Sequence, residues 1–318
     1  MKLGNKCRIG TIFLLVFIFI GPVSAQRISE SGKWNFSAVT DFAYYLKSDY
    51  VAETTHFAPV TGLYDGIKFQ ETLHAEYAEN DIITIDCALT VNIVSLCPKV
   101  SVSVTPVPFC RFSAGAMAGT GWSLLGFEGM SQYDADTRSY NNLDPFRTWY
   151  TNCWVSGTLM FDAAALWPGD WHHIVAVASY ELDSIRLLNA PSGCHVWEWG
   201  TVKGQADGLQ YSQFYLLGYK MPCMISLAGV HAVLKGHFNA DDYSGAYADY
   251  GGSFMQININ PMIQMTWTKK DSVYIMGCFS SRRSFKQSHS SIDDEPLLTY
   301  SGREWYFDSI AVSWTHTL

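Results

Sequence analysis

The amino-acid sequence predicts an all-β protein that folds as a closed antiparallel transmembrane β-barrel of about 12 strands. Strand-length segments alternate large apolar with polar residues, which is the period of two expected of a β-strand. The clearest such segment is the last one, residues 303–318, where Ile310, Val312, Trp314 and Leu318 fall on one face. Small polar residues fall on the opposite face, so we expect one face to meet lipid and the other a wet lumen.

Two residues interrupt the apolar face of this last segment. Asp308 and His316 stand near its two ends, at positions that share the apolar face. The segment taken alone also fits the final strand of a soluble β-sandwich, because one strand is a weak signal. The rest of the chain must therefore decide between the two folds.

The beginning of the sequence predicts export. Lys2, Lys6 and Arg8 precede an apolar run over Thr11–Ile20, and a small-x-small cleavage site ends at Ala25. This run is too short to span a bilayer as a helix. We expect a Sec signal peptide, the alternative being an uncleaved anchor helix.

The expected organisation is residues 1–25 as signal peptide and residues 26–318 as a single barrel domain. No later stretch is long and apolar enough for a membrane helix, so the mature chain could cross a membrane only with strands.

Twelve segments show strand patterning along the chain. In order they are Trp34–Tyr44, Ile67–Tyr77, Ile83–Ile93, Lys99–Thr105, Phe109–Trp122, Trp149–Asp162, Trp171–Leu182, Leu209–Tyr219, Cys223–Lys235, Ser253–Thr268, Val273–Ser284 and Arg303–Leu318. Pro261 interrupts one of them and predicts a bulge. The segment over Phe109–Trp122 is rich in Gly and Ala. It is either approached closely by another part of the chain or bent and weakened by glycine, and we favour the second interpretation.

The connections between these segments alternate in length. Those at 79–81, 106–108, 167–170, 220–222 and 269–271 are short, whereas those at 46–65, 123–146, 186–208, 236–252 and 285–302 are long and read as polar loops. Short periplasmic turns opposed to long extracellular loops are typical of a membrane barrel. The tip near Cys97-Pro98 is the exception, because it falls on the long-loop side and is brief.

Composition agrees with this fold and excludes one class of partner. The 318-residue chain carries a net charge of -8 and is 15% aromatic, and removal of residues 1–25 takes away three basic groups and no acid. An acidic mature chain argues against a nucleic-acid partner, since phosphate binding needs clustered Lys and Arg. Seven widely spaced cysteines remain without a CxxC motif, so neither a zinc site nor a disulfide pairing can be assigned.

Across the mature chain, the strand pattern and the closing strand resemble bacterial outer-membrane β-barrel proteins, although the last residue is Leu where that class most often has Phe. Three stretches resemble outer-membrane proteins of spirochaetes, namely TPVPFCRFSAGAMAGTGW, LGYKMP and NPMIQMTWTKKDS. The resemblance implies location in the outer membrane of a diderm bacterium and the barrel fold, and it implies no catalytic residues.

The sequence does not predict an enzyme, a cofactor or a metal site. It contains no GxSxG and no HExxH motif. His172 and His173 are adjacent on a predicted strand and would point to opposite faces, so we interpret them as interfacial residues beside Trp167 and Trp171. The acidic stretch 239–249 lacks the spaced ligands of a calcium loop and reads as a solvated outer loop.

The predicted lumen supplies the candidate binding residues. If the faces are assigned correctly, amide and charged side chains line the interior, and these are Lys68, Gln70, His74, Glu76, Asp86, Asn92, Gln256, Asn258, Asn260 and Gln264. The alternative is a hydrogen-bonded interior that only fills the barrel. A barrel of about 12 strands is intermediate in width between a small barrel packed with side chains and a wide open pore.

Three functions follow from these observations. A small-solute channel or uptake protein comes first, a surface adhesion barrel that binds through its long loops second, and a secreted soluble β-sandwich third. The expected partners are outer-membrane lipid, the barrel-assembly machinery during insertion and a small solute, with no nucleic acid.

Overall fold

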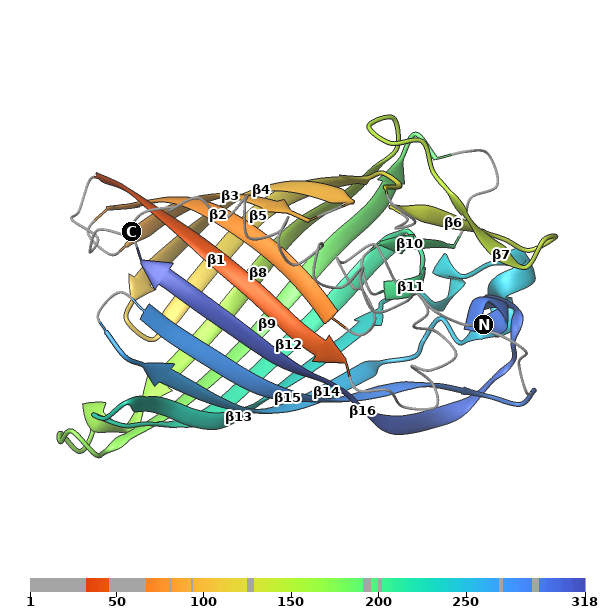
Figure 1. Cartoon of the computed structure of the whole chain (residues 1–318). Coiled ribbons are helices and arrows are strands. Elements are labelled where there is room, and N and C mark those ends of the chain that lie inside the picture. Colours follow the sequence, from red (N-terminus) through yellow and green to blue (C-terminus); the bar gives the residue numbers. More distant parts are fainter. Residues whose placement is uncertain are drawn as a thin grey trace, which may run out of the picture.

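A computed structural model describes residues 33–45, 67–79, 82–92, 94–124, 129–190, 196–199, 202–268, 271–287 and 292–317. Twelve antiparallel strands close into a barrel, as predicted (Figure 1). These strands are β1 (Lys33–Tyr45), β2 (Ile67–Glu79), β3 (Ile83–Val91), β4 (Ser95–Val107), β5 (Cys110–Gly121), β8 (Trp149–Asp162), β9 (His173–Leu188), β12 (Gly208–Lys220), β13 (Ile225–His237), β14 (Gln256–Thr266), β15 (Asp271–Phe285) and β16 (Tyr300–Thr317). The predicted signal peptide lies outside the described residues.

The barrel closes between its first and last strands. β1 pairs with β16 from Ser37↔Thr317 to Tyr45↔Ser309, and every other barrel strand pairs with its neighbours in chain order. Closure leaves no free strand edge in this sheet, which is the condition for crossing a bilayer with strands. Each strand has at least 9 residues, and a tilted membrane-spanning strand needs about 9–11.

The outside of the barrel is apolar. Large side chains that alternate along the strands are exposed on it, among them Phe36, Val102, Leu159, Leu217 and Trp314. The residues between them are less exposed and face inward. In water so much exposed apolar surface would be energetically unfavourable. In a bilayer the same surface contacts lipid acyl chains, which are also apolar. The soluble β-sandwich is therefore the wrong alternative.

A bulge in β16 explains why Asp308 stands in an apolar sequence. Cys278 pairs with Ser309 and Phe279 with Phe307, so Asp308 is the extra residue opposite no partner. The bulge shifts the alternation by one, and Trp305 then faces outward together with Ile310. The Asp308 carboxylate accepts a hydrogen bond from the Ser309 hydroxyl at 3.0 Å. The expectation that Asp308 interrupts the lipid face is corrected.

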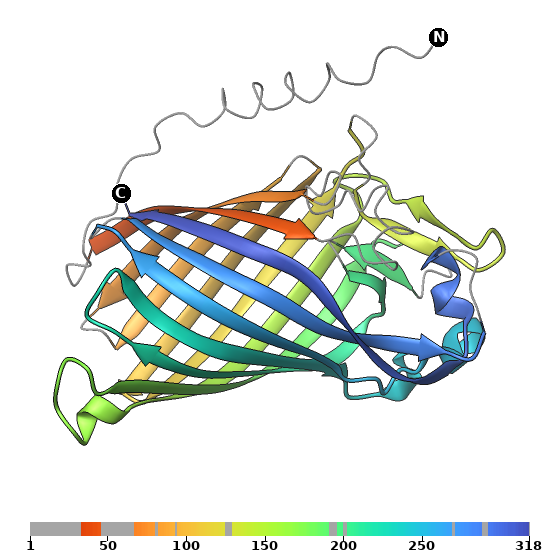
Figure 2. The same ribbon diagram turned by 60° about the horizontal axis from the view of Figure 1, so that its bottom comes forward.

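The two ends of the barrel differ as the connection lengths predict. The end that contains the C-terminus carries the short connections and is called the turn end below; the opposite end is the loop end (Figure 2). The one brief connection at the loop end spans residues 92–94. Cys97 and Pro98 were expected at its tip, but they lie inside β4 and pair with Thr90 and Leu89.

Four of the five long connections contain regular structure, and the predicted loop at 46–65 lies outside the described residues. A second, four-stranded sheet at the loop end consists of β6 (Ser131–Asp134), β7 (Ser139–Asn142), β10 (Trp197–Trp199) and β11 (Val202–Gln205). Short 3₁₀ helices η3 (Ala240–Asp242), η4 (Gly245–Tyr250) and η5 (Ile292–Leu297) occupy two further connections. The interpretation of these segments as polar loops is therefore corrected, because each of them contributes buried apolar residues.

Six cysteines among the described residues are free thiols, and none of these six pairs with another. Cys87 and Cys153 are exposed on the outer face, where the sequence pattern places them as small apolar residues. Among the described residues, no helix is long and apolar enough to cross a membrane.

Candidate functional site: the barrel interior

The inner face of β2 and β3 carries ionisable side chains in register. Glu76 stands opposite Asp86, and His74 Nδ1 lies 3.0 Å from Asp86 Oδ1. His74 and Asp86 are partly exposed, with 31% and 22% of their side-chain surfaces accessible. These three candidates therefore lie together on the interior wall, where solvent can reach them.

The amide candidates lie on one strand at the other side of the barrel. Gln256, Asn258, Asn260 and Gln264 alternate with exposed Ile259 and Ile263 along β14, which places them on the inner face. Asn260 Nδ2 lies 2.6 Å from His231 Nε2 of β13. The amides thus form a row on the inner face of one strand, separated from the charged group on β2 and β3.

The structure does not show the side chains of three predicted lumen residues in the lumen. Lys68 and Gln70 lie on β2, opposite Ala43 and Asp41 of β1, but their side chains are outside the described set. Asn92 was expected in the lumen and instead follows the end of β3, where its Oδ1 accepts a hydrogen bond from Val94 N at 2.9 Å. Its side chain stabilises the tight turn, because an Asn side chain readily accepts from the backbone two residues on.

A charged and aromatic group on the inner wall was not singled out from the sequence. Trp154 of β8 faces inward beside Asp183 of β9, and the Lys99 ammonium lies 4.9 Å from the Trp154 ring. Asn152 Nδ2 donates to Asp183 Oδ1 at 2.7 Å. Glu181 follows on the same face of β9. The alternating positions of Asn152, Trp154 and Ser156 could have indicated that all three face the interior. Trp154 was passed over because a large aromatic residue is not expected on a polar strand face.

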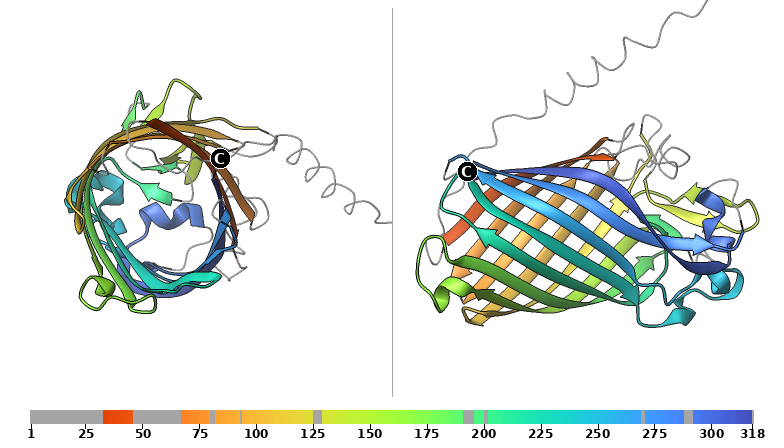
Figure 3. Two further views of the ribbon diagram at one scale, coloured as in Figure 1. Left: turned by 90° about the vertical axis from the view of Figure 1, so that its left-hand side faces the viewer. Right: turned by 90° about the horizontal axis from the view of Figure 1, so that it is seen from below.

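The loop end packs against the interior wall through an apolar cluster. Inward-facing Tyr150, Ile185 and Leu187 of β8 and β9 contact Met130 and Trp197 of the connections. Asp207 Oδ1 holds this arrangement by accepting hydrogen bonds from Leu187 N and Trp197 Nε1. Viewed from the turn end, β10, β11 and η5 lie within the outline of the barrel wall (Figure 3, left). These three elements therefore lie over the mouth of the barrel.

A second cluster joins the connections to one another. Tyr133 of β6, Val196, Ala206 and the η3–η4 tyrosines Tyr243, Tyr247 and Tyr250 are buried together. The Arg283 guanidinium of β15 lies 4.1 Å from the Tyr250 ring centroid and 5.0 Å from that of Phe254. Burial raises the pKa of Tyr243 and of Tyr250, so both hydroxyls stay neutral. We call the connections joined by these two clusters the cap.

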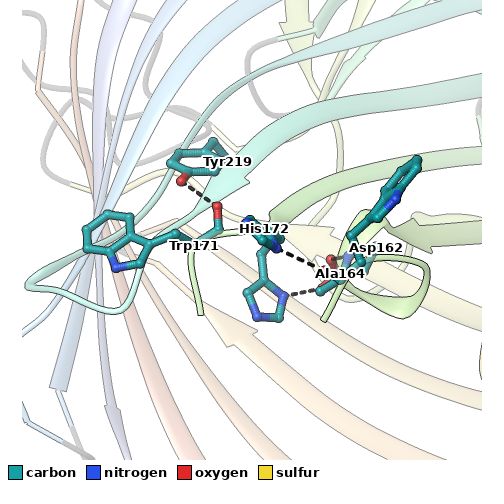
Figure 4. A network of polar contacts seen from close by, with 7 residues as sticks. Asp162, Ala164, Trp171, His172 and Tyr219 are labelled. Atoms are coloured by element: carbon teal, nitrogen blue, oxygen red, sulfur yellow. Dashed lines mark hydrogen bonds and ion pairs between the residues drawn. The ribbon is translucent and has the colours of Figure 1, made fainter. Parts of the chain in front are cut away.

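The two adjacent histidines at the turn end have separate partners. His173 Nδ1 lies 2.7 Å from Asp162 Oδ2, whereas His172 Nδ1 lies 3.2 Å from the carbonyl oxygen of Trp167. The Tyr219 hydroxyl donates to the Trp171 carbonyl at 2.6 Å and ties β12 to the same hairpin (Figure 4). These contacts organise a turn, and no group of His, Cys, Asp and Glu among the described residues is arranged to hold a metal ion.

A closed twelve-strand antiparallel barrel with an apolar exterior and a polar interior defines an outer-membrane β-barrel protein. No protein-family model matches the chain, and no curated protein matches it. Solved structures of bacterial outer-membrane proteins are similar at low identity. The outer-membrane expressed OmpT of Vibrio cholerae shares 7% identity, with 92% of this chain and 99% of that chain covered and a TM-score of 0.38.

Two further solved structures are also similar at low identity. A Pseudomonas aeruginosa FadL homologue is 9% identical, with 89% of this chain and 90% of that chain covered and a TM-score of 0.36. The outer membrane protease OmpT from Escherichia coli is 8% identical, with 88% and 90% covered and a TM-score of 0.20. With TM-scores this low, the overlays assign neither a ligand nor an activity to this chain.

The protease among these structures nevertheless corrects one prediction. The sequence analysis expected no enzyme, but an outer membrane protease matches over most of both chains. That prediction is contradicted, because barrel architecture does not by itself separate enzymes from other outer-membrane proteins.

Proposed function

We propose that this chain is an integral protein of the outer membrane of a diderm bacterium and that it passes or takes up a small solute through its interior. The observation that supports the proposal is the inner wall itself. Its ionisable and amide side chains, such as His74, Asp86 and Asn258, stand on the inward face of strands whose other face is apolar. The spirochaete resemblance and the extracellular side of the loop end stay predictions.

Electrostatics gives this proposal a sharp test. Purified, refolded protein in a planar bilayer is expected to show stepwise conductance. In a salt gradient, Asp86→Asn is expected to shift the reversal potential away from cation preference, because it removes a partly exposed negative charge from the inner wall. Val100→Thr is the matched control, since Val100 is exposed on the outer face of the adjacent strand. The absence of steps at every voltage and pH would contradict a pore.

The cap favours a second function, surface binding through the loop end. Connections from four parts of the chain share one buried aromatic cluster and therefore present one joined surface, not independent flexible loops. A barrel that lacks the β6–β7 tip, residues 135–138, should lose binding to a matrix-coated surface while it keeps its heat-modifiable migration on a gel. If all such tip deletions bind as the complete chain does, surface binding is excluded.

A further inference from the structure

The inner wall contains an apolar surface as well as the polar one. Its residues lie on five strands, and each alternates with an outward-facing side chain of the same strand. We define the inner apolar patch as Met160, Val177, Phe214, Leu216, Met262 and Met276.

Cross-strand register gathers this patch into two groups, one on each side of β13. Met160 stands opposite Val177, and Val177 opposite Leu216. On the far side of β13, Met262 stands opposite Met276. Because directly opposed residues of neighbouring strands have side chains in contact range, each group is continuous, and β13 lies between the two groups.

Such a surface is not required by the lipid or by a folding core. Met262 is buried, but the other five are only half-buried and keep part of their surface toward the interior. Apolar area left facing water is unfavourable in proportion to its extent. An apolar wall with a few placed polar groups is the usual composition of a small-molecule site.

One polar pair interrupts the patch. His231 stands between Leu216 and Asn260 in the register, its ring 5.3 Å from the Phe214 ring. Asn260 is 5% exposed, and its Nδ2 lies 2.6 Å from His231 Nε2. The remaining Asn260 Oδ1 is buried and has no hydrogen-bond partner within the described part of the chain.

We propose that the inner apolar patch binds a small amphipathic molecule. Its apolar body would lie against Leu216, Phe214 and Met262, and a hydroxyl or N–H group would donate to Asn260 Oδ1. A buried acceptor left unpaired is unfavourable, and such a donor would remove that penalty. This inference rests on the proposed solute-handling function and names the solute class: uncharged, with one hydrogen-bond donor on an apolar body.

The test uses two probes that differ only in the donor. 1-Naphthol carries a hydroxyl, and 1-methoxynaphthalene has the same ring system without a donor. Each is measured by equilibrium dialysis against nanodiscs that contain the full barrel, with empty nanodiscs subtracted to remove partition into lipid. The expected result is saturable binding of 1-naphthol to the barrel, about tenfold tighter than that of 1-methoxynaphthalene.

Three variants separate the two parts of the site. Asn260→Leu should weaken 1-naphthol binding about tenfold and leave 1-methoxynaphthalene unchanged, a difference of about 1.4 kcal/mol. Ser103→Leu removes an inward polar side chain on β4, a strand that carries no residue of the patch, and should change neither. Leu216→Ser should weaken the binding of both probes. Heat-modifiable migration on a gel checks that each variant has folded.

No saturable binding above empty nanodiscs, or equal affinities for the two probes, overturns the inference. Conductance measured on the same preparation keeps the two proposals apart. A barrel that conducts but does not bind 1-naphthol contradicts only the inference about the amphipathic ligand. A barrel that binds 1-naphthol but never conducts contradicts only the proposal of a channel.

Discussion

The indole of Trp154 lies directly over Gly115, its cross-strand partner on the inner wall. A Cβ atom built on Gly115 would stand 2.2 Å from Trp154 Cζ2, closer than non-bonded atoms can come. Gly121 is approached in the same way by the backbone at Met130. The Gly- and Ala-rich strand is therefore packed against by a neighbouring side chain and by a loop. The interpretation favoured from the sequence, a strand merely weakened by glycine, is corrected.

Gly115→Ala should destabilise the barrel by about 1–3 kcal/mol, because the added methyl forces Trp154 out of its position. The measurement is the free energy of unfolding in urea, with the protein in lipid vesicles. Gly157→Ala is the control: its Cβ would meet Phe112 at 3.8 Å, an ordinary contact. We expect a change within about 0.5 kcal/mol there. Equal losses in both variants would contradict the packing.

Val102→Lys should destabilise the membrane-inserted barrel by about 2–4 kcal/mol if the position is near the bilayer midplane, because the outward side chain meets lipid. The neighbouring Ser101→Lys places the same charge on the inner face, opposite Asp86, and should cost much less. Urea unfolding in vesicles compares the two. A larger loss at Ser101 would mean that the faces are reversed.

Asp207→Ala should loosen the cap without unfolding the barrel. It removes the acceptor of Leu187 N and Trp197 Nε1, and each lost hydrogen bond leaves a donor that costs about 1–3 kcal/mol when buried. Faster proteolysis between residues 189 and 207, and faster amide exchange at Leu187, are the expected readouts. Asp207→Asn keeps an acceptor oxygen and should show a smaller effect. Unchanged exchange in the alanine variant would exclude this role.

Asp134 should titrate below the ordinary range of an aspartate. Backbone donation from Asp136 N, at 2.9 Å, lowers the pKa of its carboxyl, and Thr137 and Asn141 contribute to the same effect. A lowered folded-state pKa means that the carboxylate stabilises the β6–β7 hairpin above the unfolded-state pKa. This stabilisation is lost as pH falls through the folded-state pKa.

Carboxyl-carbon NMR of the folded protein checks the prediction, with a peptide of residues 131–142 as the unfolded reference. An Asp134 that titrates as it does in the peptide would contradict the hydrogen-bonded turn.

Much of the barrel follows from local pattern. Strand faces could be read from alternation at residues such as Ile85 and Asp86, and strand order from chain order, because each barrel strand pairs with the next one along the chain. The same logic placed His74, Glu76 and Asn258 on the inner wall. It missed Asn92, since alternation does not reveal that a strand stops and a side chain turns to cap the backbone.

By itself, the sequence determined the barrel, its apolar outside, its polar inside and the difference between its ends. Period-two alternation and connection length are local properties of the chain, so they do not depend on which residues of neighbouring strands pair. Only the tertiary structure decided how Trp197 packs on Tyr150, how Arg283 lies among the tyrosines of η4, and which strands bring the residues of the inner apolar patch together. The physical reason is that these contacts join residues far apart in the chain, and the closure and tilt of the sheet determine which of them meet.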